Sequence, residues 1–257
     1  PLRLVGSEMC IRDSVKTGSG ALMETLPDAL ALAQTMVDIG KLAGKPVVAV
    51  ITSMAQPLGT HIGNALEVKD AIDVLAGRTQ GDLLEISLLL GSHMLVLAEK
   101  TKTLPEARAM LENALSSGAG LRKLAEMIAA QGGDPRVVED LSLLPQAAVK
   151  RVMRAETAGY LSAMDTTALG MAAQRMGAGR AKKSDMLDYS VGYVLHVRLG
   201  DEVTEDTPLA TLYARNEAEA EEAEKAIRKA LTIAKEKPQT PKLWDAVVTA
   251  EGITYNR

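Results

Sequence analysis

A helical segment followed by a short apolar run most constrains the fold of this chain. Residues 26–44 carry apolar side chains at the spacing of one helix face, and Gly40 and Gly44 lie near the end of the segment. Residues 45–52 then read as a buried strand, and a glycine-rich turn at residues 18–20 precedes both elements. This alternation predicts one crossover unit of a mostly parallel sheet, in which loops at the strand ends carry the site.

A helical layer is expected next along the chain. Helical segments are predicted at roughly 62–77, 81–100, 104–116 and 119–131, separated by Gly77, Gly81 and Pro105. The methionines spread through these segments fit gap-filling core positions better than ligand roles. Residues 15–144 are therefore expected to form a partial central α/β domain with a helical layer.

The pattern changes to short strands and turns after Leu144 and Pro145. This change predicts a domain boundary there and a small α+β domain over residues 145–257. Within it we expect a strand in residues 147–161 and a helix over 165–176, with Asp165 as the N-cap. Glycines in residues 177–179 are expected to stop that helix.

Residues 191–203 and 208–213 alternate apolar and polar side chains around a turn at Gly200 and Asp201. The alternation predicts a barrel-sandwich-like β-hairpin. The segment also resembles half of a lipoyl- or biotin-carrier barrel, although no lysine lies at the tip where such carriers are modified. A noncatalytic carrier-like or interaction domain therefore remains an alternative function.

Composition narrows the function classes. A net charge of -4 with interleaved acids and bases, and only 2% aromatic residues, argue against a nucleic-acid surface. The single cysteine, Cys10, excludes a disulfide framework and a thiolate metal site. The apolar segment 83–97 is interrupted by Glu85 and His93, so no membrane span is expected. These properties predict a cytoplasmic protein.

Residues 56–67 place a glycine-broken loop and one carboxylate, Glu67, at the mouth of a helix. We expect this carboxylate to face inward and the stretch to form a cation site; the alternative is an ordinary helix residue. The histidines at positions 61, 93 and 196 are scattered and match no nucleophile or metal motif, so they are interpreted as structural. No pair of acids stands out as a glycosidase-type pair.

Three segments resemble the pyrimidine-nucleoside phosphorylases, the family that includes thymidine phosphorylase: residues 15–23 (VKTGSGALM), 56–67 (QPLGTHIGNALE) and 177–180 (GAGR). The resemblance extends from about Val15 to about Thr240. It implies a pentosyltransferase of nucleoside salvage, in which inorganic phosphate converts thymidine or uridine into the free base and a sugar 1-phosphate. Related family members imply a second alternative, phosphorolysis of nucleoside monophosphates. The full-length protein would be a homodimer.

The resemblance also implies roles for particular residues. The backbone carbonyls of Leu58 and His61, with the carboxylate of Glu67, would bind a potassium ion. Lys16 and Leu22 would border the pyrimidine pocket. In this family the phosphate-binding and base-binding motifs precede the segment that begins at Val15, so no catalytic residue is expected in this chain and we expect it to be inactive alone.

Residues 1–14 do not fit the resemblance and read as neither a strand nor a helix start. Residues 5–14 (VGSEMCIRDS) look like a translated sequencing-adapter remnant joined to a truncated gene. We therefore interpret residues 1–14 as a non-native or artefactual segment and exclude them from fold reasoning.

Overall fold

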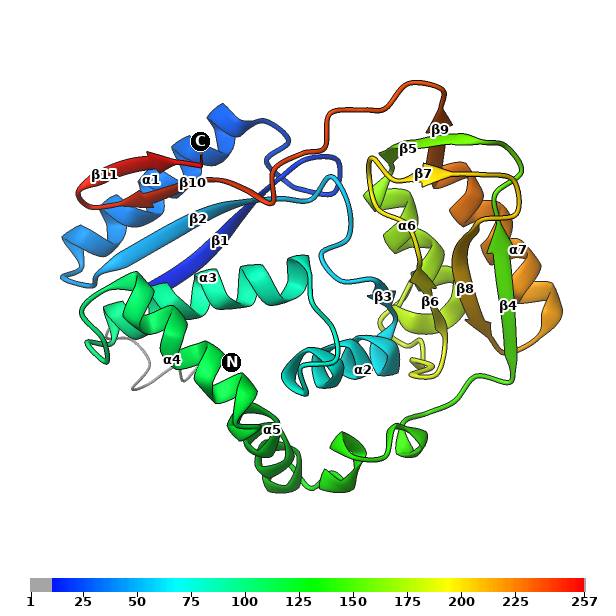
Figure 1. Cartoon of the computed structure of the whole chain (residues 1–257), viewed down its shortest axis with the longest axis horizontal. Coiled ribbons are helices and arrows are strands. Elements are labelled where there is room, and N and C mark those ends of the chain that lie inside the picture. The colour runs from blue at the N-terminus through cyan, green and yellow to red at the C-terminus, as the bar shows by residue number, and fades with distance from the viewer. Residues whose placement is uncertain (1–10, 257) are drawn as a thin grey trace. The chain divides into compact units, whose positions relative to one another are not determined.

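The computed structural model describes residues 11–256, which form two compact units (Figure 1). The first unit contains the chain up to Met54, Gln80–Ser117 and the residues from Lys242 onward. The second contains Ala55–Thr79 and Gly118–Pro241. The units are thus discontinuous in sequence, whereas the composition predicts one linear boundary between residues 144 and 145. The reason is long-range strand pairing, which a local change of composition does not report.

The first unit is built on a four-stranded sheet in the order β1-β2-β10-β11. These strands are β1 (Ile11–Thr17), β2 (Val47–Ser53), β10 (Trp244–Thr249) and β11 (Gly252–Tyr255). β1 and β2 are parallel, as predicted, but β10 is antiparallel to both β2 and β11. The α/β character is confirmed, whereas the description "mostly parallel" holds only for β1 and β2.

Residues 11–14 belong to β1, where Ile11 pairs with Val47 and Ser14 with Val50. The expectation that residues 1–14 contain no strand is therefore wrong for residues 11–14. Their extended conformation is set by pairing with a strand more than thirty residues away, not by a local pattern. Cys10 and the other residues before Ile11 lie outside the described part of the chain.

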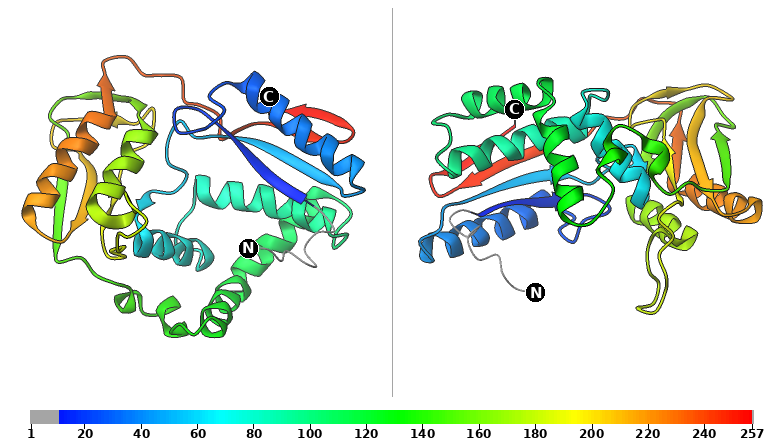
Figure 2. Two further views of the ribbon diagram at one scale, coloured as in Figure 1. Left: turned by 180° about the vertical axis from the view of Figure 1, so that it is seen from behind. Right: turned by 90° about the horizontal axis from the view of Figure 1, so that it is seen from below.

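Two layers of helices cover the sheet of the first unit (Figure 2). Its helices are α1 (Leu26–Leu42), α3 (Asp82–Leu97) and α4 (Leu104–Ser116). Side chains alternate across β2, so Val47, Ala49 and Ile51 pack against α1, while Val48 and Val50 pack against α3. A Cβ at Gly40 would lie 2.1 Å from Val47 Cγ2, so the close approach of α1 to β2 requires glycine there.

The second unit contains two antiparallel sheets. One has the order β3-β6-β8-β4 and the other β7-β5-β9. The strands are β3 (His61–Ile62), β4 (Val149–Arg154), β5 (Gly159–Met164), β6 (Gly192–Leu195), β7 (Glu202–Val203), β8 (Pro208–Ala214) and β9 (Leu231–Ala234). The small α+β domain expected from the sequence is thus built from two sheets with helices against them.

The predicted hairpin across Gly200 and Asp201 is wrong in its pairing. The turn is present, since Asp201 N donates to Arg198 O at 3.1 Å and Gly200 has a φ of 90°. However, β6 before the turn pairs with β8, while β7 after it pairs with β5 in the other sheet. The alternating pattern identified the strands, but their partners depend on contacts with distant segments.

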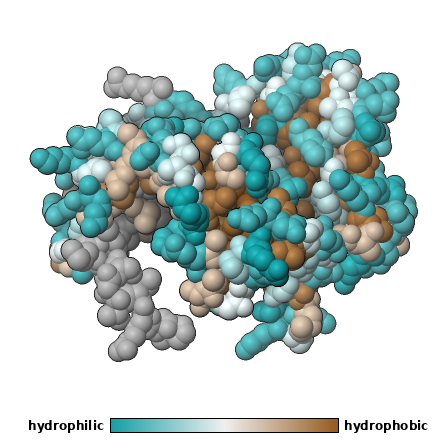
Figure 3. Space-filling view, turned by 60° about the horizontal axis from the view of Figure 1, so that its bottom comes forward, coloured by the Kyte–Doolittle hydropathy of each residue, from teal (hydrophilic) through white to brown (hydrophobic). Residues whose placement is uncertain are grey.

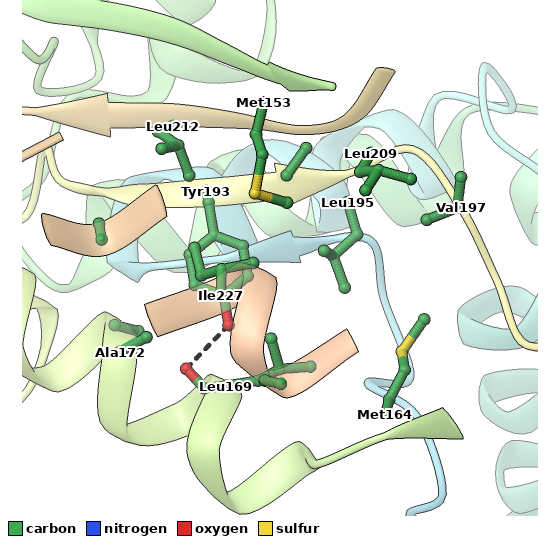
Figure 4. Packing of buried hydrophobic residues seen from close by; sticks show 14 of the residues in the cluster. Met153, Met164, Leu169, Ala172, Tyr193, Leu195, Val197, Leu209, Leu212 and Ile227 are labelled. Atoms are coloured by element: carbon green, nitrogen blue, oxygen red, sulfur yellow. Dashed lines mark hydrogen bonds between the residues drawn. The ribbon is translucent and has the colours of Figure 1, made fainter. Parts of the chain in front are cut away.

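The second unit also contains helices. They are α2 (Asn64–Leu75), α5 (Ala119–Ala130), α6 (Thr166–Ala173) and α7 (Glu217–Ala230), with 3-10 turns at Pro135–Val138 and Leu141–Leu143 and a π-helical segment at Gln174–Ala178. Asp165 accepts a hydrogen bond from Ala168 N at 2.8 Å, which confirms the predicted N-cap. In the core, Tyr193 donates its hydroxyl to Leu169 O at 2.8 Å beside Leu212 and Ile227 (Figure 4).

The surface mixes hydrophilic residues with exposed apolar ones, as the face drawn in Figure 3 shows. Leu22, Leu42 and Met186 are the most exposed of the large hydrophobic side chains, at 91%, 89% and 90%. Among residues 11–256, none of the helices is both long enough and apolar enough to cross a bilayer.

Candidate functional site

The loop at residues 56–60 leads into β3 and α2 and is attached to the segment around β6. Thr60 O accepts a hydrogen bond from Leu195 N at 2.8 Å, and Gln56 Oε1 accepts one from Leu199 N at 2.9 Å. Because both donors lie more than 130 residues further along the chain, the loop is ordered by tertiary contacts.

The carbonyl groups of this loop converge on a positive charge. Arg198 Nη1 donates to Pro57 O at 2.6 Å and lies 3.5 Å from Gly59 O, while Nη2 lies 3.4 Å from Leu58 O. The oxygen of Leu58, an expected potassium ligand, therefore faces a guanidinium. Arg198 was not identified from the sequence. In the sequence it is only a basic residue at the end of a predicted strand, and its contacts with the loop are not visible there.

His61 lies beside the buried carboxylate of Asp70. His61 Nδ1 is 3.5 Å from Asp70 Oδ1 and 3.0 Å from Thr60 Oγ1, and Asp70 is only 4% exposed. Burial lowers the pKa of His61, and the negative charge of Asp70 opposes this shift without reversing it. His61 is therefore mainly neutral at pH 7.

Glu67, the carboxylate expected to face inward, is exposed instead. Its Oε1 accepts a hydrogen bond from Gly63 N at 3.3 Å, which satisfies one of the free N–H groups at the start of α2. The inward carboxylate of this helix is Asp70, which follows Leu66 by four residues and precedes Val74 by four. Since residues four apart share a helix face, the buried stripe of Leu66, Asp70 and Val74 was visible in the sequence.

Side-chain ligands for a metal do not cluster in the described part of the chain. No three His, Cys, Asp or Glu residues between Ser14 and Asn256 are arranged to hold a metal ion. A cation at residues 56–70 would therefore depend on backbone oxygens together with one carboxylate. Potassium is compatible with such a donor set, because it binds readily to rings of backbone carbonyls.

Lys16 and Leu22 belong to the first unit. Lys16 is half-buried in β1 opposite Thr52, and Leu22 is exposed in the turn that follows. In this turn Gly18 N donates to Glu24 O at 3.4 Å and Ala21 N donates to Gly18 O at 3.0 Å. Because these N–H groups have partners within the turn, they do not form an anion-binding nest.

The third segment of the resemblance, residues 177–180, contacts the start of α2. Asn64 Nδ2 donates to Ala178 O at 2.8 Å. In the basic stretch that follows, Arg180 Nε donates to Asp185 O at 3.1 Å, and Asp185 Oδ2 accepts hydrogen bonds from Ala181 N and Lys182 N. The loop is therefore shaped by its own hydrogen bonds.

The other two histidines, His196 and His93, make different contacts from His61. His196 Nε2 is 2.7 Å from Thr211 Oγ1, and burial lowers the pKa of His196. His93 is buried in α3, where burial lowers its pKa, and its Nε2 has no hydrogen-bond partner among the described residues. Between residues 11 and 256, no nucleophile is thus hydrogen-bonded to His93 Nε2, and the hydroxyl that His196 contacts belongs to Thr211, which is buried at 5% exposure, so we assign neither histidine to catalysis.

Comparison with known proteins gives two matched family models. Residues 7–121 match the glycosyl transferase family a/b domain, and residues 160–234 match the pyrimidine nucleoside phosphorylase C-terminal domain. The first match begins inside the segment interpreted as artefactual.

Similar curated proteins share the same name. Pyrimidine-nucleoside phosphorylases of Geobacillus stearothermophilus and Bacillus subtilis are each 49% identical over 212 residues, which cover 82% of this chain and 49% of the relative. That of Staphylococcus aureus is 44% identical over 229 residues, covering 89% of this chain and 52% of the relative. The chain therefore spans about half the length of the relatives it matches.

Proposed function

Because this chain belongs to the pyrimidine-nucleoside phosphorylase family, we propose that the whole protein catalyses the phosphorolysis of pyrimidine nucleosides. A phosphate oxygen would form a bond to the anomeric carbon while the bond from that carbon to the base nitrogen breaks. The base would leave with the bonding electrons and take up a proton, giving thymine or uracil and a sugar 1-phosphate. The observation that carries this proposal is 44–49% identity over more than four-fifths of the chain.

The proposed substrates are thymidine and uridine with inorganic phosphate as co-substrate, and the proposed state is a cytoplasmic homodimer. Lys16 and Leu22 remain the proposed residues near the base; the exposure of Leu22 is compatible with a ligand or another part of the protein covering it. We expect phosphate and base recognition to come from outside this chain. Catalysis would then depend on holding phosphate and nucleoside together and on stabilising charge on the departing base.

We also propose a potassium site at the loop, with one change of ligand. The carbonyl oxygens of Leu58 and His61 remain the proposed backbone ligands, and Asp70 replaces Glu67 as the carboxylate. Two observations support this choice: Asp70 is buried beside His61, whereas Glu67 is exposed and caps α2. When bound, potassium would supply a fixed positive charge that holds the loop and the start of α2 together.

The test of activity is release of free base that depends on phosphate. The chain is assayed with thymidine, uridine and a pyrimidine nucleoside monophosphate, alone and after joining to the remaining half of the Bacillus subtilis relative. We expect release of thymine and uracil only from the joined protein. A folded joined protein with no release from any nucleoside would refute the proposal, and preference for the monophosphate would identify the alternative family activity.

The potassium site is tested by thermal unfolding in potassium chloride and in choline chloride at equal ionic strength. We expect potassium to raise Tm for the wild-type chain and for Glu67→Gln, but not for Asp70→Asn. An equal response of Asp70→Asn and the wild type would exclude Asp70 as a ligand.

The carrier-like alternative gains no support, because the turn at Gly200 and Asp201 presents no lysine.

A further inference from the structure

The guanidinium of Arg198 lies where carbonyl oxygens of the loop at residues 56–60 converge. Its two terminal nitrogens lie 2.6 to 3.5 Å from the carbonyl oxygens of three consecutive residues, Pro57, Leu58 and Gly59. Consecutive carbonyl groups of a regular strand or helix do not share one partner, so the loop is curved to bring them together. Three carbonyl oxygens that face one point repel each other, and a positive charge at that point offsets the repulsion by attracting all three.

Arg198 is itself held in place. Its backbone N–H donates to Asp201 Oδ2 at 2.7 Å, within the turn that follows β6. The next residue, Leu199, donates its N–H to Gln56 Oε1 at 2.9 Å, so the turn donates to the loop through a backbone N–H as well as through the guanidinium. Arg198 is half-buried, which reduces screening of its charge by water.

Arginine suits this position better than any other cationic side chain. Its planar guanidinium carries five N–H donors and stays protonated at all physiological pH values. One such group can therefore contact several carbonyl oxygens at once. Lysine offers a compact ammonium that cannot reproduce this planar fork.

We propose that Arg198 is a tethered cation and a positioning residue for the loop at residues 56–60. It fixes the three carbonyl groups, and through the loop it fixes the entry into β3 and α2, which carry His61 and Asp70. Loss of the guanidinium leaves a carbonyl cluster that free guanidinium fills. This inference deepens the proposed potassium site, because Leu58 O is shared between Arg198 and that site.

The test measures cleavage of the full chain by chymotrypsin after Leu58 under native conditions, with the products identified by mass spectrometry. A hydrogen bond to a charged group changes the equilibrium constant for opening of the loop by a factor of about ten or more. Arg198→Met is therefore expected to be cleaved at least about tenfold faster than the wild type. Guanidinium chloride, far below its denaturing concentration, is expected to restore slow cleavage of Arg198→Met, whereas choline chloride is not. Arg198→Lys is expected to lie between the two.

Arg175→Met serves as the matched control, because Arg175 is exposed in the same unit and makes none of the loop contacts. It is expected to be cleaved as slowly as the wild type. If Arg198→Met does not fold, the same cleavage assay is made on Arg198→Lys. Faster cleavage than in the wild type that guanidinium chloride slows then supports the proposal. Cleavage of the Arg198 variants at the wild-type rate, or faster cleavage that guanidinium does not reverse, would overturn the proposal.

The potassium site is judged separately from Arg198. A potassium-dependent rise in Tm that Asp70→Asn abolishes supports that site whatever the result with Arg198→Met. Guanidinium rescue of Arg198→Met without any potassium effect on the wild type supports the tethered cation and refutes the potassium site.

Discussion

Glu224 joins two arginines from different elements of the second unit. Arg151 Nε, on β4, donates to Glu224 Oε2 at 2.7 Å, and Arg228 Nη2, one turn further along α7, donates to Glu224 Oε1 at 2.9 Å. The Glu224 side chain is 19% exposed, so water screens these contacts only in part. Substitution by glutamine keeps the shape of the side chain and removes its charge.

The magnitude follows from the two charge-assisted hydrogen bonds. Each contributes about 1.5–3 kcal/mol when well shielded, and ion pairs open to water contribute only about 0–1 kcal/mol. Because Arg151 is partly open to solvent, we expect Glu224→Gln to lower the free energy of unfolding by about 1–2 kcal/mol at pH 7.

The effect should depend on pH in one direction. Burial alone would raise the pKa of Glu224, but the hydrogen bonds from Arg228 and Arg151 outweigh it and lower the pKa below 4.5. A carboxyl group whose pKa is lower in the folded state stabilises that state above the unfolded pKa. The contribution is lost as the pH falls through the folded pKa, so the wild type and Glu224→Gln should converge in acid.

Urea unfolding followed by tyrosine fluorescence provides the assay, because four of the five tyrosines lie in the second unit. Glu221→Gln is the matched control: Glu221 contacts Lys225 at 2.8 Å on the same helix, but both side chains are more than half exposed. It should change stability very little. Equal losses for the two variants, or a loss for Glu224→Gln that persists at acid pH, would refute the reasoning.

Three further outcomes are expected. Gly40→Ala should lower the stability of the first unit by about 1–3 kcal/mol in urea titrations followed by tryptophan fluorescence, because its Cβ would lie 2.1 Å from a methyl group of Val47; unchanged stability would contradict the close packing. Tyr193→Phe should cost about 1 kcal/mol in the tyrosine assay by removing a buried hydrogen bond to Leu169 O, and a neutral result would show that this bond adds no net stability. By NMR titration the pKa of His61 should lie below 6.5 and fall further in Asp70→Asn, so this histidine makes the folded state less stable as the pH decreases through 6.5; a rise in Asp70→Asn would exclude their charge interaction.

The helices were readily predicted because their boundaries depend on residues close to them in the sequence. The predicted segment 104–116 coincides with α4, where Thr103 accepts a hydrogen bond from Glu106 N and Pro105 lies in the first turn. Asp165 was recognised as an N-cap for the same reason. Capping residues act within a few positions of the chain, so their effect can be read without knowing the tertiary structure.

The pairing of the strands and the residues of the candidate site were harder to predict from the sequence. Residues 244–255 were expected in the second domain, whereas β10 pairs with β2, about two hundred residues earlier, and β11 pairs with β10. At the site, the loop was identified from its glycines, but Glu67 was chosen over Asp70 on the basis of spacing instead of helix face. Arg198 contacts the loop from 140 residues away, and no local sequence pattern predicts such a contact.

The return of the chain to β2 through β10 has a consequence for biosynthesis. A ribosome releases β1, α1 and β2 before the segments of the second unit, whereas β10, which covers the free edge of β2, emerges only after them. The segments of the second unit, by contrast, are all synthesised before Lys242. The second unit can therefore fold first, while the exposed edge of β2 is open to pairing with other nascent chains until Trp244–Thr249 is made.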